Sequence, residues 1–241
     1  MSTYVLVHGA WHSGDLFEEV ATHIRAAGHS VHTPTLQGNG NGDSKETGLD
    51  EAIESLIQYI LDNKISDAVL LAHSYGGMAI TGAADRLPQG TVRRLIYWSA
   101  YVPNDGESVA DITPQPFIDL WNQIREADGG IPMLYQPFRE ALINDGDEET
   151  AQYWHSRLNT QPYRTMFDKI KLQRNPADMA IGKSYIHCQD DVVYPASQGG
   201  WHPHFSERLG LFRFVSMPGS HEVCFTNPEL LARKIIIAGR D

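Results

Sequence analysis

One short segment constrains the fold of this chain more than any other part of it. An apolar run, Ala68–Leu71, leads into Ser74, and residues 78–86 after it can form a helix, so that no loop separates the three. A strand, a serine and a helix joined in this way require a very sharp turn. Small residues two positions before and two after the serine, Ala72 and Gly76, let the backbone pass close to its neighbours. The segment is therefore typical of a nucleophile elbow, which exposes the serine hydroxyl above the end of a sheet.

The composition narrows the class of protein. The 241 residues carry a net charge of −11, with 19 lysines and arginines against 30 aspartates and glutamates, and no long block has a single sign. Such an acidic balance argues against nucleic acid or an anionic membrane as a partner. Hydrophobic residues make up 41% of the chain, which is enough for a sizeable core, and no linker or repeat interrupts it. We therefore expect a single domain over residues 1–241.

Two features bear on the cellular location. The N-terminus, residues 1–7, has no basic lead, and its apolar run is too short for a signal peptide or a membrane span, so that it predicts a first strand. The two cysteines, Cys188 and Cys224, do not form a disulfide framework. We therefore expect free, buried thiols and a cytoplasmic protein.

Strand and helix signals alternate through most of the chain, which is typical of an α/β fold with a mostly parallel sheet and helices on both faces. We expect strands at residues 3–7, 30–33, 68–71, 94–98, 183–188 and 211–215, and helices at about 17–28, 49–60, 78–86 and from 228 onward. The alternation lapses at about residues 103–178. We interpret that segment as a mostly helical lid inserted between two strands, and its aromatic residues as the core of the lid.

A serine hydroxyl is a poor nucleophile near neutral pH, so it needs a base and a carboxylate that orients the base. Enzymes with this elbow carry them in the order serine, acid, histidine, on loops that follow strands. His221 has the position of the base, because it lies between the last predicted strand and the last helix. The acid should follow the preceding strand, where Asp190 and Asp191 are adjacent. Neighbouring side chains in extended structure point opposite ways, so only one of them should reach His221 while the other is solvated or braces the loop.

Acyl transfer also requires hydrogen-bond donors for the oxyanion. One should be the backbone N–H of Tyr75, directly after the serine. The second normally comes from the loop after an early strand, here residues 8–12, where the N–H of Ala10 is the natural donor. His202 and His204, near Trp201, have no third ligand at a recognisable spacing, so we predict solvated imidazoles there and no metal site.

Five segments of the chain carry a resemblance to a known family: residues 5–12, 73–77, 101–103, 185–188 and 219–222. They resemble the α/β-hydrolase superfamily and, more narrowly, its branch of small bacterial carboxylesterases, plant methylesterases and hydroxynitrile lyases. The match runs from about residue 3 to the end of the chain and is weakest in the lid. The resemblance implies a six-stranded core, a helical cap and no cofactor.

The resemblance also bears on the choice of the acid. The esterases of this branch place it three residues after a strand cysteine and four before a proline. Here Cys188 and Pro195 put it at Asp191. The spacing in the lyases differs slightly and points to Asp190, which is the runner-up.

Two departures from the family pattern bear on the activity, and a third bears on the geometry of the acid loop. The lyases have threonine where this chain has Gly9, and lysine where it has Glu222, so the groups that lyase chemistry uses are missing and cyanohydrin cleavage is disfavoured. The relatives have an ordinary helix after the acid loop, whereas residues 199–204 are Gly-Gly-Trp-His-Pro-His. We therefore expect the local geometry near the acid loop to differ from that of the relatives.

These observations predict a serine carboxylesterase that acts on small uncharged esters through an acyl-enzyme on Ser74. Two other kinds of function stay open: a lyase or cofactor-free dioxygenase on the same fold, and a non-catalytic binder of small molecules. The sequence leaves the acyl and alcohol groups of the substrate undecided. It also leaves the oligomeric state open, with a homodimer among the alternatives.

Overall fold

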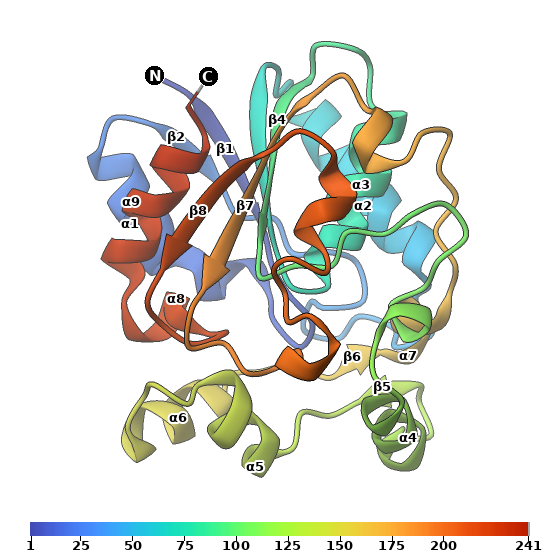
Figure 1. Cartoon of the computed structure of the whole chain (residues 1–241). Helices are drawn as coiled ribbons and strands as arrows, with labels where there is room; N and C mark the ends of the chain where they lie inside the picture. Colours follow the sequence, from blue (N-terminus) through green and yellow to red (C-terminus); the bar gives the residue numbers. More distant parts are fainter. Residues whose placement is uncertain (241) are drawn as a thin grey trace.

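Six parallel strands form the sheet at the centre of the molecule (Figure 1). The computed structural model describes residues 1–240. Along the sheet the strands follow the order β2-β1-β3-β4-β7-β8, and each neighbouring pair is parallel. Their bounds are β1 Thr3–Val7, β2 Ser30–His32, β3 Ala68–His73, β4 Val92–Trp98, β7 Gly182–Cys188 and β8 Arg213–Met217. The α/β fold with a largely parallel sheet, predicted from the alternation, is confirmed.

Helices cover both faces of the sheet because alternate strand residues point to opposite sides. Tyr4 and Leu6 of β1 belong to the core beneath α1 (Glu18–Ala26) and α9 (Pro228–Ala238). On the other face, Val5 and Val7 pack with α2 (Leu49–Asp62) and α3 (Gly76–Arg86). The apolar stripe of α2 that the sequence predicts is buried along its whole length. A short 3₁₀ helix, η1 (Gly14–Phe17), precedes α1, and α8 (Val223–Thr226) precedes α9.

Several elements begin at other residues than predicted, among them β4 at Val92 and β7 at Gly182, and two of the shifts lie close to the site loops. The helix after the elbow, α3, begins at Gly76 rather than at Met78, because the N–H of Met78 already donates to the carbonyl oxygen of Tyr75 in the first turn. The last strand, β8, begins at Arg213 and ends at Met217, since Leu211 lies outside it with its side chain 91% exposed. Neither shift moves a candidate site residue off its loop.

In the segment between β4 and β7, the helices α4, α5 and α6 lie beyond the carboxyl ends of the strands, below the sheet in Figure 1. The helices of this segment are α4 Gln115–Ile124, α5 Tyr135–Pro137, α6 Glu148–His155 and α7 Tyr163–Phe167, with shorter turns η2 Ala110–Ile112, η3 Phe138–Leu142 and η4 Pro176–Asp178. It also contains a small antiparallel sheet, β5 (Gly130–Ile131) with β6 (Gln161–Pro162). Strands of two residues have no periodic pattern, so the sequence did not predict them.

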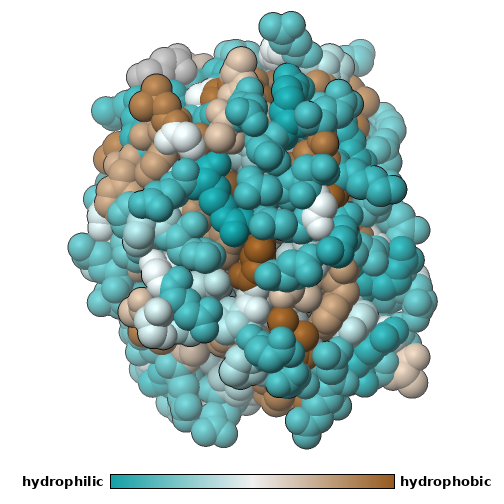
Figure 2. All heavy atoms as spheres, turned by 45° about the vertical axis from the view of Figure 1, so that its right-hand side comes forward, coloured by the Kyte–Doolittle hydropathy of each residue, from teal (hydrophilic) through white to brown (hydrophobic). Residues whose placement is uncertain are grey.

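Polar side chains dominate the face shown in Figure 2, and hydrophobic residues gather on it in small separate patches, among them one at the upper left and one near the centre. In the described part of the chain, no helix has both the length and the apolar character that crossing a membrane would require. Cys188 and Cys224 are buried free thiols, as expected.

Candidate active site

Ser74 stands at the turn between β3 and α3. Its φ angle is +51°, in the left-handed region that a residue with a side chain rarely adopts. The carbonyl oxygen of Ser74 accepts hydrogen bonds from the N–H groups of Gly77 and Tyr101, both at 3.1 Å, which hold the turn. A Cβ atom at Gly76 would lie 2.5 Å from the carbonyl oxygen of His8. The turn therefore has the sharp, crowded geometry that its small residues predict.

His221 and Asp191 are in direct contact. Nδ1 of His221 lies 2.7 Å from Oδ2 of Asp191, and the two side chains are only 3% and 0% exposed. Oδ1 of the same carboxylate accepts the backbone N–H of Val193 at 3.0 Å, which fixes its orientation. Because a carboxylate only accepts hydrogen bonds, Nδ1 carries the proton and Nε2 is free to act as a base.

Asp190 braces the loop that carries the histidine. Its Oδ2 accepts the N–H of Gly219 at 2.8 Å, and its own N–H donates to the carbonyl oxygen of Gly219 at 3.1 Å. Asn144 donates to the carbonyl oxygen of Asp190 at 3.1 Å. The side chain of Asp190 is exposed and makes no contact with the ring of His221. Of the two adjacent aspartates, the structure therefore brings Asp191 to the histidine.

Trp201 covers the ring of His221. The two rings are stacked, with centroids 5.3 Å apart and planes 17° apart, and Trp201 is 1% exposed. Burial by itself lowers the pKa of His221, but the charge and hydrogen bond of Asp191 and the charge of Glu222 together raise it above its usual 6.5. The imidazole is thus buried and held by a carboxylate while it retains a raised basicity.

Ser74 and His221 line one cavity of about 270 Å³ together with Ala10 and Tyr75. Within residues 1–240 the backbone N–H groups of Ala10 and Tyr75 have no hydrogen-bond acceptor. Most of the remaining wall is apolar and comes from the lid, including Phe117, Leu120, Trp121, Ile124, Met133 and Leu134. None of the described residues that line the cavity is an aspartate, glutamate, lysine or arginine.

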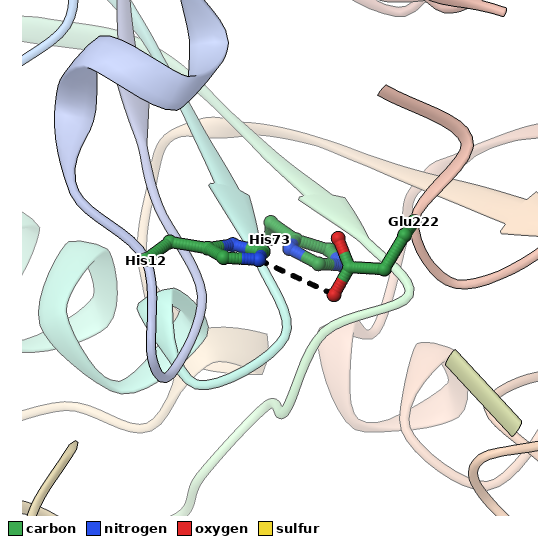
Figure 3. Close-up of side chains that lie close together, drawn as sticks. All are labelled: His12, His73 and Glu222. Carbon is green, nitrogen blue, oxygen red and sulfur yellow. Dashed lines mark ion pairs between the residues drawn. The ribbon is translucent and has the colours of Figure 1, made fainter. Parts of the chain in front are cut away.

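A second group of polar side chains, drawn in Figure 3, lies next to His221 through the ring of His73. His12 from the loop after β1, His73 from the end of β3 and Glu222 point toward one another, and all three are buried. Nε2 of His12 lies 3.4 Å from Oε1 of Glu222. The ring of His73 stacks on Trp98 with centroids 4.0 Å apart, and its centroid is 4.5 Å from that of His221.

The chemistry of this group allows two roles: its members could be ligands of a metal ion, or their charges could act on His221. Imidazole and carboxylate are ligand types that Zn²⁺ accepts, and the ligand atoms of His12, His73 and Glu222 lie within 4.8 Å of one another. Burial, followed by the charges of His221 and His12, holds the pKa of His73 well below 6.5, so its ring is neutral. The Glu222 carboxylate pairs with His12, and its charge also acts on His221. No other group of this kind occurs in the described chain.

The predicted solvated histidines have protein partners instead. Nδ1 of His202 lies 2.6 Å from the hydroxyl of Ser206, and His204 stacks on Tyr194 with centroids 5.2 Å apart. Both are partly buried. Neither belongs to the buried His-Glu group.

Several residues of the cavity could not be identified from the sequence. The aromatics of the lid were interpreted as its core, yet Phe117 and Trp121 line the cavity. Their helical spacing indicates a buried face but not what the face covers. Trp201 belongs to the segment that departs from the family pattern, and that departure was the only signal of its position.

A family model described as the alpha/beta hydrolase family matches residues 4–234. The chain therefore belongs to the α/β-hydrolase family, as its motifs and its sheet order indicate.

Three proteins illustrate what the chain is similar to. The solved structure of an extracellular α/β-hydrolase from a Paenibacillus species, described as sharing structural and functional homology with tobacco salicylic acid binding protein 2, is 31% identical. It covers 100% of both chains with a TM-score of 0.95. Methylesterase 7 of Arabidopsis thaliana is 32% identical over 215 residues, which cover 80% of this chain and 79% of that one. A carbendazim hydrolyzing esterase of a Nocardioides species is 40% identical over 118 residues, about half of either protein (48% of each).

Proposed function

We propose that this α/β-hydrolase is a serine esterase that hydrolyses small, uncharged carboxylic esters through an acyl-enzyme on Ser74. The observation that carries the proposal is one apolar cavity lined by Ser74 and by a buried His221 whose Nδ1 is held by Asp191. Relatives named esterase and methylesterase support the same class of reaction.

The proposed reaction has two halves, the acylation of Ser74 and the hydrolysis of the acyl-enzyme. Oγ of Ser74 attacks the ester carbonyl carbon while Nε2 of His221 takes its proton, and the alcohol leaves with that proton. A water molecule then attacks the acyl carbon, again losing a proton to His221, and the acid is released as Ser74 recovers its proton. Asp191 stabilises the imidazolium that forms in each half. The free N–H groups of Ala10 and Tyr75 would hold the oxyanion.

The cavity favours a neutral and largely apolar substrate. Its described wall has no side chain of aspartate, glutamate, lysine or arginine, and its volume is about 270 Å³. A charged group on the substrate would lose its hydration there without gaining a partner. Aromatic rings such as those of Phe117 and Trp121, which line the cavity, offer flat apolar surfaces to an ester.

Two features oppose the lyase alternative. A Cβ atom at Gly9 would lie 2.8 Å from Nδ1 of His73 and 3.2 Å from Cβ of Ser74, so a threonine does not fit here without a shift. Glu222 is buried against His12 and brings negative charge where lyase chemistry uses a lysine. Neither feature obstructs ester hydrolysis.

The decisive experiment compares wild type with Ser74→Ala on p-nitrophenyl esters of increasing acyl length. We expect kcat/KM to fall by about three to five orders of magnitude, since the nucleophile is lost. Ser156→Ala, an exposed serine of the lid, is the matched control and should retain the wild-type rate. A Ser74→Ala enzyme that keeps its activity would remove the proposed mechanism.

A fluorophosphonate probe with intact-mass detection separates the esterase from a non-catalytic binder. The esterase should gain one adduct, which Ser74→Ala should lack. Folded protein that binds the ester but forms no adduct would favour a binder. Esters matched in size, with and without a free carboxylate, then test the substrate class: the neutral member should react at least about ten-fold faster.

A further inference from the structure

The loop that carries the Ala10 N–H has a conformation that must be held by its surroundings. Trp11, the next residue, has a φ angle of +65°. For a residue with a side chain the left-handed region is unfavourable. A short loop in such a conformation keeps its shape only where neighbouring groups bind it.

The groups that bind Trp11 all belong to the lid. Its backbone N–H donates to Oε1 of Gln161 at 2.9 Å, and its carbonyl oxygen accepts the N–H of Asn159 at 2.7 Å. Its indole N–H donates to the carbonyl oxygen of Ile131 at 2.9 Å. Three hydrogen bonds therefore join the lid to Trp11, the residue directly after Ala10. Two involve its backbone N–H and carbonyl oxygen, and the third involves its indole N–H.

Gln161 is the only one of these partners that uses a side chain, and that side chain is fully buried. Its Oε1 also accepts Nδ2 of Asn39 at 2.9 Å, and its Nε2 donates to Oγ1 of Thr165 at 2.6 Å. Thr165 in turn donates to the carbonyl oxygen of Pro162 at 2.6 Å, so its lone pairs face Gln161. Each polar atom of the Gln161 amide has a partner, which fixes both its position and its orientation.

We propose that Gln161 is a positioning residue for the oxyanion. By accepting the N–H of Trp11 it holds the loop of residues 8–12 so that the N–H of Ala10 stays aimed at the reaction centre of Ser74. An oxyanion donor acts only within about 2.7–3.1 Å of the developing charge, and a displacement of about 1 Å can cost about 100-fold in rate. The lid would thus complete the catalytic site as well as close the cavity. This inference rests on the proposed esterase function.

The central variant is Gln161→Met, which keeps the length of the side chain and removes the acceptor. The N–H of Trp11 and the amide of Asn39 lose their shared partner, so the loop can relax from its left-handed geometry. We expect kcat to fall about 10- to 100-fold while KM stays within about three-fold, because the lost interaction acts in the transition state. Binding of a boronic acid that mimics the tetrahedral intermediate should weaken in parallel, whereas binding of a product alcohol should not.

Gln161→Glu tests the acceptor itself. Because Gln161 is fully buried, a glutamate there should stay protonated. Its carbonyl oxygen then accepts from Trp11 and Asn39, and its O–H donates to Oγ1 of Thr165 as the amide does, so kcat should recover to within about three-fold of wild type. Gln152→Met, an exposed glutamine of the same lid, controls for the glutamine-to-methionine change. Thermal unfolding of each variant confirms that folded protein is compared.

Three results would overturn the inference: a wild-type kcat in folded Gln161→Met, a rise in KM alone, or a Gln161→Glu enzyme as slow as Gln161→Met. If Gln161→Met fails to fold, Gln161→Glu against wild type decides, since a large loss of kcat there contradicts the proposal. These outcomes are distinct from a failure of the esterase function, which would show as activity that survives Ser74→Ala.

Discussion

Trp201 lies flat against the imidazole of His221, with ring centroids 5.3 Å apart and planes 17° apart. The segment that contains Trp201 departs from the family pattern, and in the structure its indole packs against the candidate base. Tyr101 and Phe205 pack against the same indole, with centroids 5.1 Å and 5.5 Å away. The departure thus supplies a ring that packs against the candidate base.

Replacing this indole should weaken both the fold and the site. Trp201→Leu removes a ring that is 1% exposed, so we expect a loss of about 3 kcal/mol in the free energy of unfolding. The rate should fall as well, because His221 gains freedom. Urea unfolding and kcat/KM measure the two effects, and Trp201→Phe, which keeps a ring, should lose less of each. Equal effects of the leucine and phenylalanine variants would argue against a role for the stacked ring.

The two adjacent aspartates should differ sharply in their effect on the rate. Asp191→Asn replaces the acceptor of the His221 Nδ1 proton and can impose the wrong tautomer, so kcat should fall by about 10³- to 10⁴-fold. Asp190→Asn keeps an oxygen that can accept the N–H of Gly219, so its loss should stay below about ten-fold. Steady-state kinetics on one activated ester compare them directly. A larger loss for Asp190→Asn would mean that the acid is assigned to the wrong residue.

The pH dependence of kcat/KM should reflect the raised pKa of His221. The base acts as neutral imidazole, so the rate falls as the pH drops through its pKa, and that limb should lie above pH 6.5. The charge of Glu222 is one of the groups that raise this pKa. In Glu222→Gln the limb should therefore move to lower pH. Glu229→Gln, at an exposed position of α9, should leave the limb in place, and an unmoved limb in Glu222→Gln would exclude the electrostatic effect.

His8 should make the fold sensitive to acid. Burial lowers its pKa from 6.5 to about 4, and its Nε2 accepts the N–H of Leu36 at 3.0 Å while Nδ1 contacts the carbonyl oxygen of Gly9 at 2.8 Å. Between these two pKa values His8 is neutral in the folded state, whereas in the unfolded chain it binds a proton. The free energy of unfolding is therefore unaffected by His8 above pH 6.5 and decreases as the pH falls toward 4, by about 3 kcal/mol in all.

Urea unfolding at pH 7.5 and pH 4 tests this dependence. His8→Gln should lose less stability between the two pH values than wild type, by about the same 3 kcal/mol. An equal loss in both proteins would place the acid sensitivity on other groups.

Local patterns in the sequence predict the order along the chain of the six strands of the main sheet, the long helices that cover it, and the elbow. Apolar periodicity follows from which residues a strand or helix buries. The small residues around Ser74 are required by a tight turn, in which the carbonyl oxygen of Ser74 accepts two N–H groups at 3.1 Å. The strand-end positions of Ser74, His221 and the two aspartates were likewise readable, because parallel strands bring their carboxyl ends to one edge of the sheet.

Contacts between residues far apart in the chain were decided only by the tertiary structure. The sequence left Asp190 and Asp191 open on the residues alone, since the choice depends on which side chain the β7 loop turns toward His221. No local pattern predicts the stacking of Trp201 on His221. The same holds for the hydrogen bond from Trp11 to Gln161, which lies 150 positions away. Packing selects such partners by shape and by hydrogen-bonding capacity, whereas periodicity records only whether a residue is buried.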